Sequence, residues 1–301
     1  MVFLFTAVTS PFVVLFGPFN NVKRAVIGAI LQSRHPQYIT WLFSNDELQS
    51  ILGTVGVVKS QDLFKFNARE DKDLKLEKIE SSRYVGYVLE IPDPRRIQVA
   101  TAANIQEKGD TTSNIAKMNG AVAAINGGGF HDPNGTGTGR LPYGFILHEG
   151  DYIIGKDVGP DESVDFVGFS KSGNLIAGNY DKTELADMKA IEGITFGPPL
   201  IVDGKKMITD GDGGWGVGPR TAIGQRKDGT VLFVVIDGRQ PGYSLGATLR
   251  DVQDVLYEKG AYIAANLDGG SSSTLYLNGK VVNKPADLLG ERMIPTAFIV
   301  K

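Results

Sequence analysis

The 301-residue chain is long enough to bury a substantial core and can hold one large domain or two small ones. Its 31 basic and 34 acidic side chains nearly balance, so no basic surface argues for a nucleic-acid partner. The chain has no cysteine, which excludes disulfides, thiolate metal sites and a cysteine nucleophile. This composition does not exclude an extracellular location.

The first segment, residues 1–22, carries no charge and is mostly apolar, and basic residues follow from Lys23. About 20 apolar residues span a bilayer, although Pro11, Gly17 and Pro18 weaken this segment as a helix. We expect a signal peptide or membrane anchor here, and hence a membrane partner. A buried N-terminal core helix is the alternative.

The next segment, residues 23–80, is expected to be a spacer. Its first part, to about residue 60, is typical of helices, and residues 61–80 are crowded with charges of both signs. The compact domain is expected to cover residues 81–301, where short β-like runs alternate with glycine-rich turns and few helices.

A strand-helix-strand pattern stands near the C-terminus. The runs VLFVVI (231–236) and AYIAANL (261–267) are typical of strands buried on both faces. Between them, Thr248 is a helix N-cap with Asp251 three residues on, and Gly260 ends the helix. We expect a β-α-β unit with parallel strands and a right-handed crossover. The predicted fold class is α+β, with a mixed, largely buried sheet.

An acid follows each of these two strands. Parallel strands would bring Asp237 and Asp268 to the same edge of the sheet, about 5 Å apart on adjacent strands or about 10 Å apart across one intervening strand. Ligands of such sheets bind at the carboxyl ends of the strands. The glycines and serines at 269–273 would allow close backbone approach to a ligand and offer donors to it.

Three successive glycines, 127–129, follow another predicted strand at 121–125. They suggest either the close approach of some other group to the backbone or a strained turn that needs positive φ.

Two arginines stand near the predicted acids. Arg220 precedes the strand-like TAIGQ, and Arg239 follows Asp237. A single arginine before a strand is usually a surface residue in a weak ion pair. Two guanidinium groups beside two carboxylates suit an anionic substrate such as a phosphate.

Four motifs occur in order over about residues 81–301: AAINGGGF, FGPPLIVDGK, GPRTAIG…DGTVLFVVIDGR and GATLRDVQDVLYEKGAYIAANLDGGSSSTLYLNGKVVN. Together they resemble the phosphodiester glycosidase family, whose bacterial members include proteins labelled as exopolysaccharide-biosynthesis proteins. The sequence has GGSSS where many relatives have GGGSS. This conservative change stiffens the loop at most.

The resemblance implies hydrolysis of the bond between a sugar anomeric carbon and a phosphodiester, without cofactor or metal. The substrate would be a sugar phosphodiester or anionic glycan, and the protein would be membrane-anchored or secreted, on the extracellular face of a bacterial cell. Asp237 and Asp268 would be the catalytic acids, and either could be the acid or the nucleophile or base. The residues implied to bind substrate are Asn126, Gly127, Gly128, Arg220, Thr221, Arg239, Gly269, Gly270, Ser271 and Ser272.

Other interpretations remain open. A non-catalytic module that binds anionic polysaccharide would use the same arginines, whereas a phosphodiesterase that cleaves at phosphorus would ordinarily need metals. The stretch 209–218 resembles a calcium loop but lacks the required glutamate, so a plain turn or a mobile lid carrying Trp215 is expected. His131 is a candidate catalytic helper. The sequence predicts no oligomeric state.

Overall fold

The structure, a computed structural model, describes residues 11–31, 37–44, 47–48, 51, 58–60, 63–67, 70–132 and 137–301. Residues 1–10 of the predicted anchor and most of 45–57 therefore lie outside the described residues. Among the described helices, none is long and apolar enough to cross a bilayer.

The described strands form three sheets, and each sheet is named below by its strands in spatial order. The first sheet comprises β1 (Lys75–Glu80), β2 (Val85–Ile91), β13 (Val231–Ile236), β12 (Arg220–Arg226), β14 (Ala261–Leu267), β10 (Pro199–Val202) and β11 (Lys205–Lys206). The second comprises β16 (Lys280–Val281), β15 (Leu275–Leu277), β4 (Ala123–Asn126), β17 (Thr296–Val300) and β3 (Ile97–Thr101). The third comprises β6 (Asp151–Ile154), β5 (Ile146–His148), β9 (Ala190–Thr195), β7 (Val164–Ser170) and β8 (Leu175–Tyr180).

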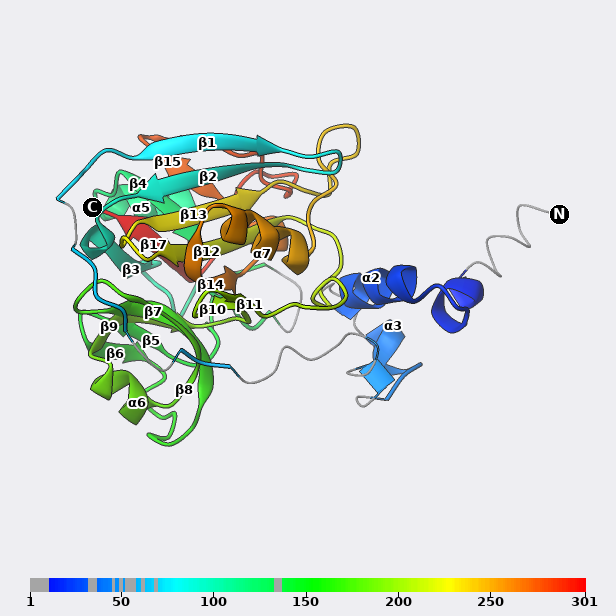
Figure 1. Ribbon diagram of the computed structural model, residues 1–301, viewed down its shortest axis with the longest axis horizontal. Coiled ribbons are helices and arrows are strands. Elements are labelled where there is room, and N and C mark those ends of the chain that lie inside the picture. The colour runs from blue at the N-terminus through cyan, green and yellow to red at the C-terminus, as the bar shows by residue number, and fades with distance from the viewer. Residues whose placement is uncertain are drawn as a thin grey trace.

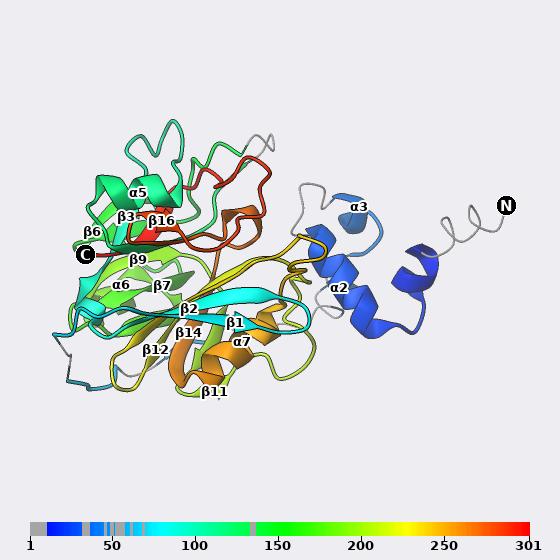
Figure 2. The same ribbon diagram turned by 90° about the horizontal axis from the view of Figure 1, so that it is seen from above.

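One central hydrophobic core joins the three sheets, since its members come from strands of all of them, such as Phe233, Phe298 and Phe169. Helices pack on the sheets outside this core (Figures 1 and 2). The helices of the compact body are α5 (Thr112–Met118) on the second sheet, α6 (Lys182–Asp187) on the third and α7 (Leu249–Glu258) on the first, with short 3-10 turns η1 (Pro94–Arg96) and η2 (Gly270–Ser272). This predominance of strands over helices confirms the α+β class.

The strand-helix-strand prediction is confirmed at its predicted residues. Strand β13 covers 231–236 and β14 covers 261–267, and Thr248 caps α7 in a capping box with Asp251. Strand β12 lies between β13 and β14 and is antiparallel to both. Strands β13 and β14 are therefore parallel but are not hydrogen-bonded to each other. Of the two predicted arrangements, adjacent strands or one intervening strand, the second is correct.

The compact body extends on the N-terminal side of Ser81. Strand β1 pairs with β2 along its whole length, so a boundary at Ser81 separates two paired strands. Further upstream, Phe64 packs against the central core, and the Tyr180 hydroxyl donates to the carbonyl of Ser60 at 2.8 Å. The charged segment before Ser81 thus contributes an exposed edge strand to the first sheet.

The N-terminal helices lie beside this body (Figure 1). Helices α2 (Asn20–Leu31) and α3 (Gln37–Thr40) share a small core with Leu15, Phe43 and Leu48, in agreement with the helical character predicted there. Arg24 of α2 reaches Asp210 of the main body at 3.5 Å.

Candidate active site

The predicted site residues meet at one edge of the first sheet. Arg220 opens β12 opposite the last residue of β13, and Thr221 lies opposite the last residue of β14. Asp237 and Asp268 follow those two strands directly. With β12 between them, the two acids leave the sheet about 10 Å apart.

Asp268 is held in place through its backbone. Its N–H donates to the carbonyl of Gly127 at 3.0 Å, and the Asn126 side chain donates to its carbonyl. The residue is partly exposed at the sheet edge. These bonds fix the acid between the first and second sheets.

The electrostatic surroundings of Asp268 tune its proton affinity. Burial raises the pKa of the carboxyl to about 6, while the Ser272 hydroxyl, Arg292, the Gly269 amide and Arg239 act in the opposite direction. A carboxyl group with a pKa near neutrality is suited to take up and release protons at physiological pH.

Asp237 is in a different situation, since it is only 1 % exposed. Its carboxylate accepts hydrogen bonds from the Tyr243 hydroxyl (2.9 Å), the Asn283 amide (3.0 Å) and the Lys284 N–H (3.0 Å). Burial raises its pKa, and these hydrogen bonds oppose that shift. Through these contacts Asp237 joins the loop that holds Tyr243 to the loop that holds Asn283 and Lys284. They favour a structural role over the catalytic role that the resemblance implies.

Arg220 is also buried, at 5 % exposure. Its Nε donates to the carbonyl of Ala247 (3.0 Å), and one terminal nitrogen donates to the carbonyls of Trp215 (2.8 Å) and Gly216 (2.6 Å). Burial, followed by repulsion from Arg239, lowers its pKa to about 10. These bonds anchor the loops around the site. The second terminal nitrogen, Nη1, takes part in none of them and would lie 3.7 Å from a Cβ on Gly269, so it is on the side of the loop after Asp268.

Arg239, in contrast, remains exposed and reaches the loop after Asp268. Its φ of 58° is unusual for a residue other than glycine. A Cβ on Gly270 would lie 3.3 and 3.4 Å from its two terminal nitrogens, so the guanidinium lies over that glycine. Partial desolvation and Arg292 lower the pKa of Arg239, and Asp268 raises it. Among the predicted arginines, this one is placed to meet an anion beside Asp268.

Asn126 is fully buried and its side chain connects both sheets. Its oxygen accepts hydrogen bonds from the Thr221 hydroxyl (2.7 Å) and the Thr274 N–H (3.1 Å). Its nitrogen holds the carbonyl of Asp268. Asn126 and Thr221 thus support the loop after β14 from below, and their contacts do not favour direct contact with sugar.

The glycines at 127–129 make room for protein side chains. A Cβ on Gly127 would lie 2.5 Å from the Thr296 hydroxyl, and one on Gly129 would lie 2.7 Å from the Phe196 ring and 2.8 Å from the Tyr143 ring. These glycines do not have positive φ. Of the two hypotheses for the triplet, close approach is therefore the correct one and the strained turn is wrong. The approaching groups are side chains of the protein itself.

The loop 269–273 forms the rim next to Asp268. A Cβ on Gly269 would lie 2.9 Å from the carbonyl of Pro219, so this glycine fits closely against β12. The hydroxyls of Ser272 and Ser273 are both buried without a hydrogen-bond partner of normal geometry among the described residues. Ser272 is still close enough to lower the pKa of Asp268, and Ser271 is partly exposed. The loop therefore offers hydroxyl groups near the acid.

Sequence reasoning missed Arg292 and Tyr143. Arg292 acts on the charge of Asp268, and Asp268 contributes, after burial, to raising the pKa of Tyr143. The stretch around Arg292, ADLLGERMIP, has no motif that marks this arginine. The NGGGF motif could have pointed to this region, since the guanidinium carbon of Arg292 lies 4.8 Å from the centre of the ring of Phe130, the last residue of the motif.

The remaining sequence candidates have lesser roles in the site. The loop at 209–218 holds Trp215, which contacts Phe196 edge to face at 6.1 Å between ring centroids. His131 is exposed and contacts Tyr143 edge to face at 4.5 Å. Within the described part of the chain, no three histidine or acidic side chains gather in a way that could hold a metal.

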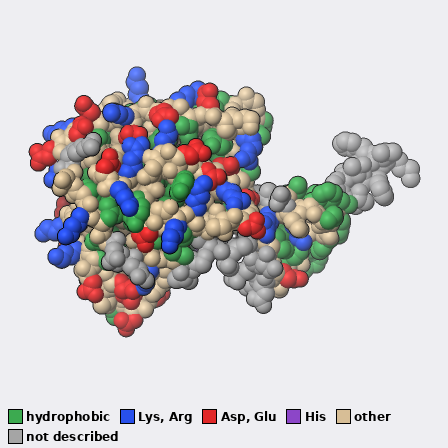
Figure 3. Space-filling view, in the orientation of Figure 1, with side chains coloured by type: hydrophobic (Ala, Val, Ile, Leu, Met, Phe, Trp, Pro, Cys, Tyr) green, Lys and Arg blue, Asp and Glu red, His purple; other side chains and the backbone are tan. Residues whose placement is uncertain are grey.

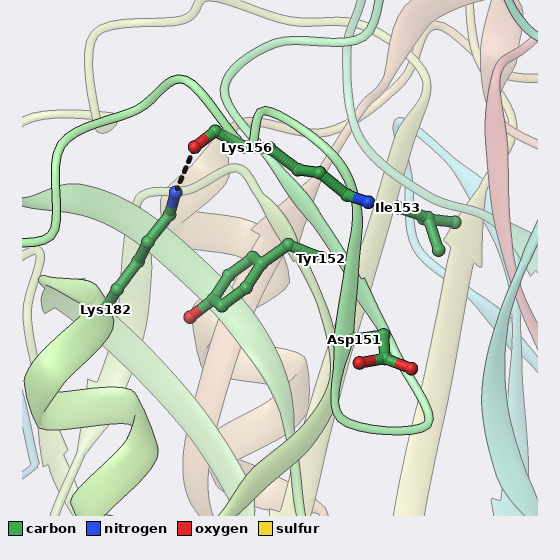
Figure 4. A pocket seen from close by; sticks show the side chains of 5 residues that line it. All are labelled: Asp151, Tyr152, Ile153, Lys156 and Lys182. Atoms are coloured by element: carbon green, nitrogen blue, oxygen red, sulfur yellow. Dashed lines mark hydrogen bonds between the residues drawn. The ribbon is translucent and has the colours of Figure 1, made fainter.

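An open pocket of about 550 Å³ lies at the β5–β6 hairpin and is lined by Asp151, Tyr152, Ile153, Lys156 and Lys182 (Figure 4). Its Lys182 donates to the carbonyls of Gly155 (2.9 Å) and Val158 (2.6 Å) and lies 4.7 Å above the Tyr152 ring. Because its lysine is engaged in holding the hairpin, this pocket offers less chemistry than the edge at Asp268.

Comparisons with known proteins find related sequences. The phosphodiester glycosidase family profile matches residues 119–301, more than half of the chain. An uncharacterized SPbeta prophage-derived protein of Bacillus subtilis is 32% identical over 63% of this chain and 29% of its own length. The N-acetylglucosamine-1-phosphodiester alpha-N-acetylglucosaminidase of Bos taurus is 25% identical over 61% of this chain and 36% of its own length. The chain thus spans less than half of these relatives.

Solved structures share the fold. The catalytic domain of the zebrafish N-acetylglucosamine-1-phosphodiester alpha-N-acetylglucosaminidase, auto-inhibited by its pro-peptide, superposes with a TM-score of 0.62 at 21% identity, covering 79% of this chain and 86% of that one. A hypothetical protein from Synechocystis superposes with a TM-score of 0.53 at 17% identity, covering 76% and 62%. With the profile match over residues 119–301, the resemblance carried by the motifs is confirmed: the chain belongs to the phosphodiester glycosidase family.

Proposed function

We propose that the protein hydrolyses the bond between a sugar anomeric carbon and the oxygen of a phosphodiester, with Asp268 as the reacting carboxyl. The observation that carries the proposal is the placement of Asp268: a partly exposed acid at the sheet edge with a pKa of about 6, beside Arg239 and above Asn126. Family membership and the names of the bovine and zebrafish relatives support the reaction type and make an α-linked N-acetylglucosamine phosphodiester the first substrate to test.

The carboxylate of Asp268 acts as general base in this proposal. It takes a proton from water while the water oxygen bonds to the anomeric carbon, and the bond from that carbon to the phosphate oxygen breaks. The electron pair leaves with the phosphate, so the products are a free sugar and a phosphomonoester. A phosphate group leaves readily without protonation, so a second acid is not required, in keeping with the engaged carboxylate of Asp237.

The site of bond cleavage can be tested with isotopically labelled water. The full chain is incubated in ¹⁸O-water with the benzyl phosphodiester of α-N-acetylglucosamine 1-phosphate. Release of sugar carrying the label, absent in Asp268→Asn, is the expected result. Label in the phosphate product instead would show cleavage at phosphorus and would contradict the glycosidase assignment.

We also propose that the protein works at the cell envelope or outside the cell, with its N-terminal helices against a membrane. Phe12, Phe16, Phe19 and Trp41 are exposed in the segments that flank α2 and α3, and Figure 3 shows hydrophobic side chains gathered at this end of the molecule. Exposed aromatic residues of this kind favour the interface of a bilayer. The full chain should float with lipid vesicles, and replacing Phe12, Phe16 and Trp41 by serine should abolish flotation. A full-length chain that stays in the vesicle-free fraction would argue against this proposal.

A further inference from the structure

We propose that Arg239 and Arg292 together hold the phosphate of the substrate, and that Asp132 and Phe130 position Arg292 for this task. The inference rests on the proposed function and extends it to the residues that select a phosphodiester over a neutral glycoside.

Arg292 is placed by groups from another loop. One terminal nitrogen donates to the Asp132 carboxylate at 3.0 Å, and the guanidinium carbon lies 4.8 Å above the Phe130 ring. Its side chain is 23% exposed, and its Nε is buried without a hydrogen-bond partner among the described residues. The guanidinium is thus fixed in position, and the exposed part of the side chain lies beyond the buried Nε, at the terminal nitrogens.

The same loop connects Arg292 to the reacting acid. Phe130 ends the NGGGF run, which begins beside Asp268, because the N–H of Asp268 donates to the carbonyl of Gly127 at 3.0 Å. Arg239 approaches from the opposite loop and lies over Gly270, two residues after Asp268. The two arginines therefore flank the acid from different elements.

Their charges support one shared anion site. Arg292 lowers the pKa of both Asp268 and Arg239, so the three groups interact electrostatically. Like charges held near each other favour an anion that lies between them, and a guanidinium suits the paired oxygens of a phosphate. Arg220 is left out of the pair, since it is buried and three backbone carbonyls occupy its Nε and one of its terminal nitrogens.

This arrangement assigns a chemical role to the pair. As the bond between the anomeric carbon and oxygen breaks, the phosphate gains a second negative charge, and two fixed guanidinium groups stabilise that charge more than the single charge of the diester. Arg239 and Arg292 should therefore affect the cleavage of phosphodiesters far more than that of neutral glycosides with the same sugar.

The test measures binding of inorganic phosphate to the full chain by calorimetry. Arg239→Gln and Arg292→Gln should each weaken phosphate binding by about tenfold or more. Asp132→Asn keeps both arginines but removes the ion pair that positions Arg292, so it should weaken phosphate binding less than either arginine substitution does. Arg96→Gln is the matched control and should leave phosphate binding unchanged. Arg96 donates to the carbonyls of Lys301 and Lys72. Lys301 follows the end of β17 that lies away from Asn126, so Arg96 is remote from the candidate site.

The outcomes separate this inference from the proposed reaction. Phosphate binding that survives both glutamine substitutions in folded variants overturns the pair, even when the wild-type chain cleaves diesters. Loss of phosphate binding in both variants supports the pair. If the wild-type chain also releases no sugar, that second result contradicts the proposed reaction and leaves the pair supported. If Arg292→Gln does not fold, Arg292→Lys decides: a loss of about threefold or more supports the pair, and unchanged binding overturns it.

Discussion

At the level of single residues, the pH dependence of the reaction follows from Asp268. Burial raises the pKa of this carboxyl to about 6, and a general base works only when it is ionised. The value of kcat/KM should therefore rise with pH through about 6 and then level off. Initial rates measured between about pH 4 and pH 8 check this, and a fall in kcat/KM over the same window would show that Asp268 acts as an acid.

The two acids should also differ in their effect on stability. Asp237 is buried and accepts hydrogen bonds from three donors, two of which donate to the same carboxylate oxygen. In an asparagine, the N–H groups of the amide would face at least one of these donors and could not accept its hydrogen bond. Asp237→Asn should lower the free energy of unfolding by about 1–3 kcal/mol. Thermal unfolding at pH 8 measures this loss, and an unchanged melting temperature would mean that the network does not stabilise the fold.

Asp268→Asn should behave in the opposite way at pH 8 while abolishing turnover. The pKa of Asp268 in the folded state lies above its unfolded value of about 3.9, so ionisation weakens the folded state as pH rises through about 6. The variant should therefore match or exceed wild-type stability at pH 8, by on the order of 1–2 kcal/mol, and lose that advantage below pH 4. A variant less stable than wild type at pH 8 would contradict the conclusion that the ionised Asp268 carboxylate weakens the folded state.

At the level of elements, the loop after β4 depends on contacts too close for a side chain. Gly129→Ala would place a Cβ 2.7 Å from the Phe196 ring and should destabilise the protein by about 1–3 kcal/mol while displacing Tyr143. Gly159→Ala is the control, because its Cβ would meet only Glu162 at 3.8 Å. Denaturant unfolding of both variants tests the prediction, and equal stabilities would show that the loop can adapt.

At the level of the whole molecule, the compact body needs more of the chain than its motifs suggest. A chain that begins at Ser81 lacks β1, the Phe64 packing and the hydrogen bond from Tyr180 to Ser60. It also exposes β2 as an unprotected edge, which favours aggregation. A chain that begins at Val58 should remain monomeric and melt at a higher temperature. Equal melting and equal solubility of the two chains would place the true boundary at Ser81.

The sequence by itself determined the local elements and the family. Strands β13 and β14 and helix α7 lie where their apolar runs and capping residues predicted them, because burial periodicity and caps act over a few neighbouring residues. The order of the two acids along the chain also placed them at one sheet edge, since a strand-helix-strand unit makes both strands point the same way.

Only the tertiary structure decided which of these side chains are free. Asp237, Arg220 and Asn126 have the residue types of a reactive site, yet contacts with distant segments engage each of them. Arg292 has no motif, and Asp132 and Phe130, about 160 residues earlier, place it near Asp268. Burial and hydrogen-bond partners come from such long-range contacts, which a local pattern does not encode. The sequence therefore indicated the candidate site, and the fold shows which of its side chains are held by other parts of the protein.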